Sequence, residues 1–218
     1  MNVAELSIGR PETYHWAKRP VTTAIVKKPV AGPIYLHIQQ FEGDGQADLR
    51  HHGGEDKAVC VYPAVHYSWW EQKLQRKLPP AAFGENITVS ELTESTAHIG
   101  DVYQIGGAIV QLSQPRQPCF KLALRYGDTS FPVKVRETGW SGWYFRVLKE
   151  GMVKKGDEWN LLERQKSTMT VMEANRIMYQ QEGGLEAVEV LASLPTLADV
   201  WKQQLRSIIR KAEGDQST

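Results

Sequence analysis

The sequence lacks several features that would identify a class of protein from composition alone. It has only two cysteines, too few for the disulfide framework of a small secreted domain. Its 26 basic and 25 acidic residues nearly cancel, which argues against nucleic acid or an anionic membrane surface as a partner. No apolar run approaches the ~20 residues of a membrane span, and the N-terminus lacks the order of a signal peptide. We therefore expect a cytoplasmic protein with free thiols and no nucleic-acid or membrane partner.

The length of 218 residues fits one substantial domain with a small appendage. Short runs punctuated by glycine, proline and aspartate predict many strands between about residues 21 and 163. These runs are PIYLHIQQ, NITVSEL, DVYQIG, AIVQLSQ and EWNLLER. In the first, Ile34, Leu36 and Ile38 alternate with polar neighbours, as one buried face demands. The pattern predicts a mainly β domain with some helix, folded as a barrel or curled sheet, over residues 1–166.

One helix is expected inside this strand-rich part, in the segment YPAVHYSWWEQKL. Pro63 suits its first turn, where a missing N–H is tolerated. At helical spacing Tyr62, His66 and Trp70 fall on one face, so this aromatic face is a candidate pocket lining.

After about Lys166 the pattern changes to three short helices, which predicts a separate helical module over residues 167–218. Thr170 with Glu173 forms a capping box at the start of the first helix. The other boundaries are marked by Gly183, Gly184, Pro195, Thr196 and Asp199.

The segment from Phe41 to Pro63, FEGDGQADLRHHGGEDKAVCVYP, concentrates acids, histidines, glycines and a lysine. Paired glycines let backbone amides approach an anion, while lysine supplies positive charge, so this segment is a candidate phosphate site. Its candidate residues are His52, Gly53, Gly54, Asp56 and Lys57. A tight polar turn is the alternative, because the spacing matches neither a Walker loop nor a dinucleotide fingerprint.

The segment SQPRQPCFKL presents a thiol in a rigid frame. Pro115 and Pro118 bracket Arg116 and place Cys119 just after a kink. A thiolate near arginine is a good soft-metal ligand or nucleophile. A buried, inert cysteine remains the alternative. In a third segment, AFGENITV, Glu85 and Asn86 lie at a turn into a strand, where an amide can recognise a heterocycle or serve only the turn.

Four blocks in this order, HGGEDKAVCVYP, FGENITV, IGDVY and SQPRQPCFKL, resemble the MOSC domain family (molybdenum cofactor sulfurase C-terminal domain), and within it the YiiM-like subgroup. The match spans about residues 21–163, and the part from Thr168 resembles the three-helix (3-alpha) module of that subgroup. The resemblance implies a MOSC-type β-barrel that binds the molybdopterin form of the molybdenum cofactor. It also implies reduction of N-hydroxylated compounds such as 6-hydroxylaminopurine.

The resemblance identifies the expected metal ligand, and the chemistry of the implied cofactor suggests candidates for its other contacts. Cys119 falls on the family cysteine and is the expected molybdenum ligand, whereas Cys60 does not match that position and is assigned to packing. Candidates for the cofactor phosphate are Lys57, Arg116, His52 and the Gly53–Gly54 turn, with Lys27 and Lys28 as weaker ones. Candidates for the pterin ring are Glu85, Asn86 and Ser113. Either His66 or His52 would relay protons, since histidine titrates near neutral pH; a core role for His66 is the alternative.

No flavin, haem or iron–sulfur motif occurs, so the implied reductase needs a separate electron-donor protein. Lys202, Arg206 and Arg210 form a basic stripe that either docks this donor or is an ordinary solvated face. We expect a monomer or homodimer acting on a small N-hydroxylated substrate. Two other functions remain open: Cys119 as a nucleophile, and a non-enzymatic carrier of molybdenum cofactor or sulfur.

Overall fold

The computed structural model describes residues 1–16, 19–49 and 53–215. The strands are β1 (Val3–Ile8), β2 (Glu12–Trp16), β3 (Arg19–Thr23), β4 (Lys28–Pro29), β5 (Ile34–Leu36), β6 (Val59–Pro63), β7 (Ile87–Val89), β8 (Val102–Ile105), β9 (Ala108–Pro115), β10 (Trp143–Lys149), β11 (Gly151–Val153) and β12 (Trp159–Glu163). The helices are α2 (Tyr67–Leu74), α3 (Phe120–Tyr126), α4 (Phe131–Thr138), α5 (Val171–Gln180), α6 (Gly184–Ser193) and α7 (Asp199–Asp215), with 3-10 turns at Glu55–Lys57 and Ala64–His66.

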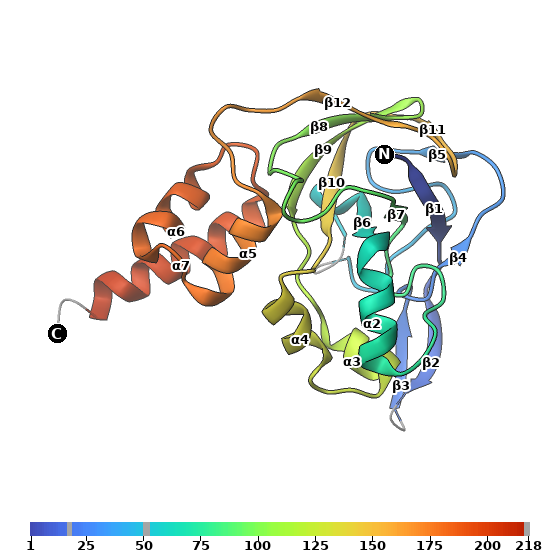
Figure 1. Cartoon of the computed structure of the whole chain (residues 1–218), viewed down its shortest axis with the longest axis horizontal. Helices are drawn as coiled ribbons and strands as arrows, with labels where there is room; N and C mark the ends of the chain where they lie inside the picture. The colour runs from blue at the N-terminus through green and yellow to red at the C-terminus, as the bar shows by residue number, and fades with distance from the viewer. Residues whose placement is uncertain (17–18, 50–52, 216–218) are drawn as a thin grey trace.

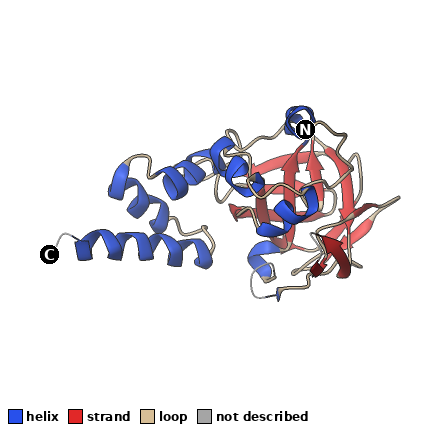
Figure 2. Cartoon of the chain, turned by 90° about the horizontal axis from the view of Figure 1, so that it is seen from below, coloured by secondary structure: helices blue, strands red, loops and turns tan. Residues whose placement is uncertain are grey.

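An eight-stranded sheet forms the body of the molecule, with strand order β12-β8-β9-β10-β6-β7-β1-β4. Neighbouring strands are antiparallel except β6 and β7, which run parallel. The sheet curls until its two sides meet: Val3 N donates to Asp157 O over 2.9 Å, and Gly156 N donates to Val3 O over 2.9 Å. Figures 1 and 2 show this curled sheet beside a group of helices. The predicted fold class, a barrel-like β domain with helices and a helical C-terminal part, is confirmed.

The inside of the curled sheet is filled by apolar and aromatic side chains. Tyr103, Phe145 and Trp159 pack against one another with ring centroids 5.6 to 5.8 Å apart. The same core continues into the helices of the C-terminal part, where Val171 and Trp201 belong to it. Burial of this much apolar surface is the main stabilising contribution. The sheet also starts earlier than residue 21, where the sequence placed the start of the core, because β1 is one of its strands.

Helices α2, α3 and α4 lie together at one end of the barrel (Figure 1) and enclose a second cluster of aromatic side chains. Trp70 packs on Phe131 with centroids 5.0 Å apart. The predicted helix at YPAVHYSWWEQKL is present in its second half only, since Tyr62 and Pro63 end β6 and a 3-10 turn precedes α2.

Helices α3 and α4 were not expected from the sequence. They have seven and eight residues, and each ends at a glycine with left-handed backbone. Such short helices contain too few turns for a helical period to stand out. The predicted strand PIYLHIQQ is likewise shorter than expected: β5 ends at Leu36, and Ile38 is exposed.

Helices α5, α6 and α7, here called the tail, extend to one side of the barrel (Figure 2). The Thr170–Glu173 capping box is confirmed, because Glu173 N donates to Thr170 Oγ1 over 3.1 Å and Thr170 N donates to Glu173 Oε2 over 2.7 Å. As expected, α6 starts at Gly184, and Pro195 lies beyond its end. No helix among the described residues is long and apolar enough to cross a bilayer.

Replacing Thr170 with alanine should destabilise the tail by about 1 kcal/mol, because the N-cap acceptor of α5 is lost. Chemical denaturation of the full chain would measure the change. Ser193→Ala, which changes an exposed residue at the C-terminal end of α6, is the control and should have a smaller effect. An unchanged midpoint for Thr170→Ala would contradict the role of the cap.

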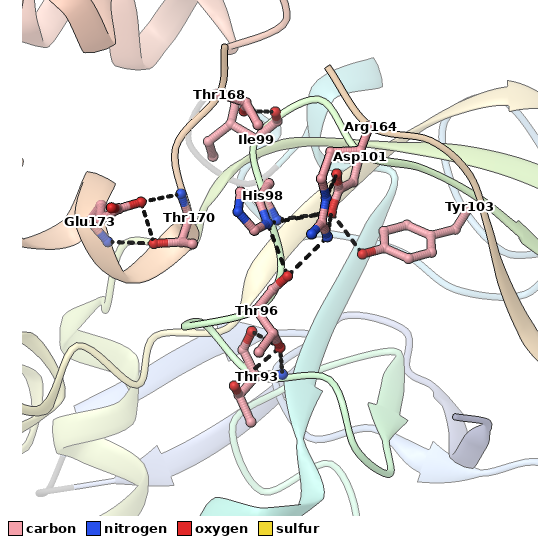
Figure 3. Close-up of polar contacts among 10 residues, drawn as sticks. All are labelled: Thr93, Thr96, His98, Ile99, Asp101, Tyr103, Arg164, Thr168, Thr170 and Glu173. Atoms are coloured by element: carbon pink, nitrogen blue, oxygen red, sulfur yellow. Dashed lines mark hydrogen bonds and ion pairs between the residues drawn. The ribbon is translucent and has the colours of Figure 1, made fainter. Parts of the chain in front are cut away.

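A buried carboxylate joins the barrel to the segment that leads into the tail (Figure 3). Asp101 is fully buried and accepts hydrogen bonds from Arg164 Nε (2.8 Å), Arg164 Nη2 (2.6 Å) and Tyr103 Oη (2.9 Å). His98 N donates to the same carboxylate over 3.0 Å. Next to it, Ile99 N donates to Met169 O over 2.8 Å. The chain between β12 and α5 is therefore held against the barrel by side-chain and backbone hydrogen bonds.

Candidate functional site

A cavity of about 70 Å³ lies where the curled sheet meets α3 and the loops after β3 and β5. We call it the basic cavity. It is lined by Thr23, Ala24, Ile25, Lys27, Gly45, Gln46, Ala47, Lys57, Cys60, Gly84, Asn86, Arg116, Cys119, Lys121 and Tyr144. Four of these side chains are cationic and two are thiols. Segments far apart in the sequence thus converge on one site suited to an anion and a soft metal.

The loop Pro115–Cys119, here called the PRQPC loop, supplies an arginine and a thiol to the basic cavity. Its start is fixed because Pro115 ends β9 and Arg116 N donates to Gly142 O over 3.0 Å. The Arg116 guanidinium is buried and donates to Phe83 O over 2.5 Å. Cys119 is the residue before α3 and remains partly exposed, so its thiol is accessible from the cavity.

Cys60, on β6, is the second thiol of the basic cavity. Burial raises its pKa to about 11, although the Arg116 guanidinium opposes this shift. Tyr144 lies beside the Cys60 thiol and Arg116, and its interactions with them affect the pKa values of Cys60 and of Tyr144 itself. Burial alone would lower the pKa of Arg116, but the charges that Cys60, Tyr144 and Cys119 can carry raise it above its ordinary value. Arg116 thus lies where it can neutralise a thiolate on either cysteine.

Asp44 holds two side chains that line the basic cavity, Lys27 and Asn86. One carboxylate oxygen accepts from Lys27 Nζ over 2.5 Å and from Gly9 N over 2.7 Å. The other accepts from Asn86 Nδ2 over 2.8 Å, and Asn86 Oδ1 in turn accepts from Cys60 N over 3.1 Å. The Asn86 amide is therefore used within the protein on both its oxygen and its nitrogen. Asn86 lines the cavity as predicted, but its hydrogen bonds fix the wall.

The other two lysines of the cavity differ in their surroundings. Lys121, in the first turn of α3, is 8% exposed and has no ion-pair partner in the part of the chain that the structure describes. Burial lowers the pKa of Lys57, while Asp56 and Asp48 oppose that shift. The Lys121 ammonium is not among the enclosed side-chain atoms that lack a partner, so it keeps contact with solvent in the cavity, where an anionic ligand could pair with it. Lys121 thus makes the cavity a site for an anionic ligand.

The turn of the FGEN block closes the cavity from one side. Gly84 has a φ of 81°, and a Cβ there would lie 2.5 Å from Ile25 Cγ1. Arg125 holds the same region from α3, since its Nη1 donates to Ile25 O over 3.1 Å and to Ala82 O over 2.9 Å. The glycine of this block is thus explained by close packing against a wall of the cavity.

Several predicted residues lie outside the lining of the basic cavity. His66 is buried, with Nε2 2.7 Å from Glu94 Oε2, and stacks on Trp140 at a centroid distance of 4.2 Å. This is the core role left open in the sequence, and it supplies no observation for proton relay. Glu85 is fully buried and accepts from Tyr67 Oη and from Phe83 N. Its carboxylate, like the Asn86 amide, is used within the protein.

The glycine turn also lies apart from the thiols. Gly53 and Gly54 line a separate groove of about 400 Å³ that also includes Lys57. Asp56 forms an ion pair with Arg146 over 2.6 Å. The buried Ser113 hydroxyl lies 2.6 Å from Asp56 O and 3.0 Å from Tyr144 O and does not line the cavity.

His52 lies outside the described residues. Of the predicted cofactor-binding residues, the structure brings Lys57, Asn86, Arg116 and Cys119 together in the lining of the basic cavity. It adds Cys60, Lys121 and Tyr144, and it places Lys27 in the wall, whereas Lys28 is exposed. Lys121 follows Cys119 by two residues, and this proximity was the one signal in the sequence that it would reach the cavity. Nothing in the sequence distinguished Tyr144 from other strand residues.

Family models match two parts of the chain. The model for the MOSC domain matches residues 48–160, and the model for the YiiM-like, 3-alpha helix domain matches residues 169–211. The chain belongs to the MOSC domain family. This confirms the resemblance seen in the four ordered blocks and in the tail.

Relatives of this MOSC protein share most of its length. The uncharacterized protein YflK of Bacillus subtilis (strain 168) is 48% identical, covering 92% of this chain and 91% of YflK. The crystal structure of YiiM from Geobacillus stearothermophilus has a TM-score of 0.82 at 37% identity, covering 95% of this chain and 98% of that chain. A protein of Gibberella moniliformis (strain M3125 / FGSC 7600) named a reductase is 32% identical over 86% of this chain, which covers 34% of that protein.

Proposed function

We propose that this MOSC protein binds the molybdenum cofactor, in its molybdopterin form, in the basic cavity and reduces N-hydroxylated compounds. The observation that carries the proposal is the convergence on one cavity of the Cys119 thiol, the buried Arg116, and Lys121, which has no ion-pair partner among the described residues. A soft thiolate suits molybdenum, and clustered cations suit a phosphate. The Gibberella relative named a reductase supports an enzyme over a passive carrier.

The residues of the cavity suit the parts of this cofactor. Cys119 would hold the metal, and Arg116 beside it would balance the negative charge of the thiolate. Lys121 and Lys57 would bind the phosphate, while Lys27 is already neutralised by Asp44. Asn86 would contribute indirectly, because its amide fixes Cys60 and Asp44.

When bound, the cofactor supplies the two-electron chemistry that cleavage of an N–O bond requires. A hydroxylamine R–NHOH, two electrons and two protons give R–NH₂ and water. The electrons would come from a separate reductase protein. Within the cavity, Arg116 would place positive charge near the oxygen that leaves as water, which stabilises developing negative charge there. No described histidine lines the cavity, so the protons would come from solvent or from the lysines.

The test is to purify the protein from cells that make the cofactor, and to measure molybdenum and the reduction of 6-hydroxylaminopurine with an artificial electron donor. Near-stoichiometric molybdenum together with turnover supports the proposal. Molybdenum without turnover would favour a cofactor carrier. Thiol reactivity without molybdenum would favour a cysteine nucleophile, and either of these results overturns the reductase proposal.

Lys121→Met should reduce the molybdenum content at limiting cofactor by about tenfold, the loss expected for one charge-assisted hydrogen bond. It should leave the stability of cofactor-free protein within about 0.5 kcal/mol, since the ammonium makes no ion pair among the described residues and keeps contact with solvent in the cavity. Metal analysis and chemical denaturation measure the two effects. Lys28→Met, an exposed lysine outside the cavity, is the control. Equal molybdenum in both variants would exclude Lys121 from the anion site.

A further inference from the structure

The middle of the PRQPC loop is held by the tail. Gln117 Nε2 donates to Gln204 Oε1 over 2.6 Å, and Gln204 Nε2 donates to Gln117 Oε1 over 3.3 Å. Gln204 lies on α7, 87 residues further along the chain. Two primary amides facing each other in this way satisfy a donor and an acceptor on each side. The pair therefore fixes the orientation of the Gln117 side chain as well as its position.

A second tail helix reaches the same residue. Tyr179, on α5, lies beside Gln117: burial raises the pKa of this tyrosine, and its interaction with Gln117 opposes the shift. Nearby, Ala198 N, just before α7, donates to Ser113 O on β9 over 2.9 Å. The tail thus contacts the strand that leads into the PRQPC loop and the loop itself. The contacted residue Gln117 is flanked in the chain by Arg116 and Pro118–Cys119, and Arg116 and Cys119 line the basic cavity.

The loop transmits this anchoring to its two cavity residues over a very short stretch of chain. Arg116 immediately precedes Gln117, and Cys119 follows it by two residues with Pro118 between them. Proline fixes its own φ and restricts the residue before it, so Gln117 has little freedom to move independently of Cys119. Cys119 itself makes no side-chain cap hydrogen bond to α3. A displacement at Gln117 would therefore move the thiol.

We infer that the tail is a positioning element of the cavity: Gln204 and Tyr179 hold Gln117 and thereby set the direction in which Cys119 presents its thiol. The inference deepens the proposed function, which rests on the same thiol. It assigns the tail a role within this chain, where the sequence alone predicted a separate module. Gln204 and Tyr179 are positioning residues, since they act through Gln117 and do not line the cavity.

The test uses Gln204→Ala in the full chain without cofactor, with Cys119 alkylation by iodoacetamide followed by peptide mass spectrometry. We expect alkylation to be about fivefold faster, the change in loop opening that corresponds to one lost hydrogen bond. Gln203→Ala, an exposed neighbour on the same helix, should match the unaltered protein. Gln204→Glu keeps an acceptor for the shorter of the two bonds and should restore most of the protection.

General loosening of the tail is separated from positioning by Thr170→Ala, which weakens α5 at its cap far from Gln117. If Thr170→Ala accelerates alkylation as much as Gln204→Ala, or if Gln204→Ala has no effect, the inference is wrong. Because alkylation needs neither molybdenum nor substrate, its outcome is independent of whether the protein is a reductase. In loaded protein, the same variant should lower kcat more than it changes KM.

Discussion

A Cys119→Ser variant is expected to retain less than about a tenth of the molybdenum of the unaltered protein and to lose reductase activity by about a hundredfold or more, because a hydroxyl is a poor substitute for a soft thiolate ligand. The substitution keeps the size of the side chain at a partly exposed position before α3, so the fold should survive. Metal analysis and turnover with an artificial donor measure both losses on the same preparation.

Cys60→Ser is the matched control, since both thiols line the basic cavity. Burial raises the pKa of Cys60 to about 11. At pH 8 roughly one Cys60 in a thousand would then be a thiolate, which makes it the weaker candidate ligand. Cys60→Ser should therefore retain molybdenum. The reverse result, with metal lost from Cys60→Ser and kept in Cys119→Ser, would move the ligand to β6.

Protection from alkylation gives an independent check on the same assignment. Cofactor-loaded protein should react with iodoacetamide at Cys119 far more slowly than cofactor-free protein, because the thiol is occupied. Equal rates in the two preparations would leave Cys119 outside the metal site, whatever the activity of the variants.

The sequence could predict the parts of the site that depend on local patterns. The PRQPC segment places Arg116 and Cys119 in one loop because prolines restrict the backbone on both sides of them. The capping box at Thr170 was predictable for the same reason, since a side chain three residues away satisfies it. The order of the blocks was enough to identify the MOSC family.

The residues that sequence reasoning missed or misplaced depend on contacts between distant segments. Asn86 and Glu85 have groups suited to a pterin, but their partners are Asp44, Cys60, Tyr67 and Phe83 within the protein. Whether a polar group faces a ligand or another side chain is decided by tertiary packing. Cys60 was assigned to packing and is indeed buried, yet it also lines the basic cavity. Tertiary packing likewise places the Gly53–Gly54 turn in a neighbouring groove, apart from the thiols.

Replacement of Asp101 by alanine is expected to have the largest effect on stability, about 3 kcal/mol or more, because it leaves several buried donors without their acceptor. The lost partners are Arg164, Tyr103 and the backbone N–H of His98 (Figure 3). Denaturant unfolding of the full chain measures the change. Arg164→Ala should cost less, since its guanidinium is partly exposed and Asp101 keeps its other two donors.

The position of this carboxylate predicts a local effect as well as a global one. Asp101 lies between the barrel and the segment that leads to the tail, next to the hydrogen bond from Ile99 N to Met169 O. Asp101→Ala should therefore make the chain between β12 and α5 sensitive to limited proteolysis before the barrel unfolds. Because Asp101 contacts neither Gln117 nor Gln204, Asp101→Ala should accelerate Cys119 alkylation less than Gln204→Ala does. Since the two substitutions act on separate contacts, their effects on alkylation should add; acceleration by Asp101→Ala equal to that of Gln204→Ala would show that general loosening of the tail exposes the thiol.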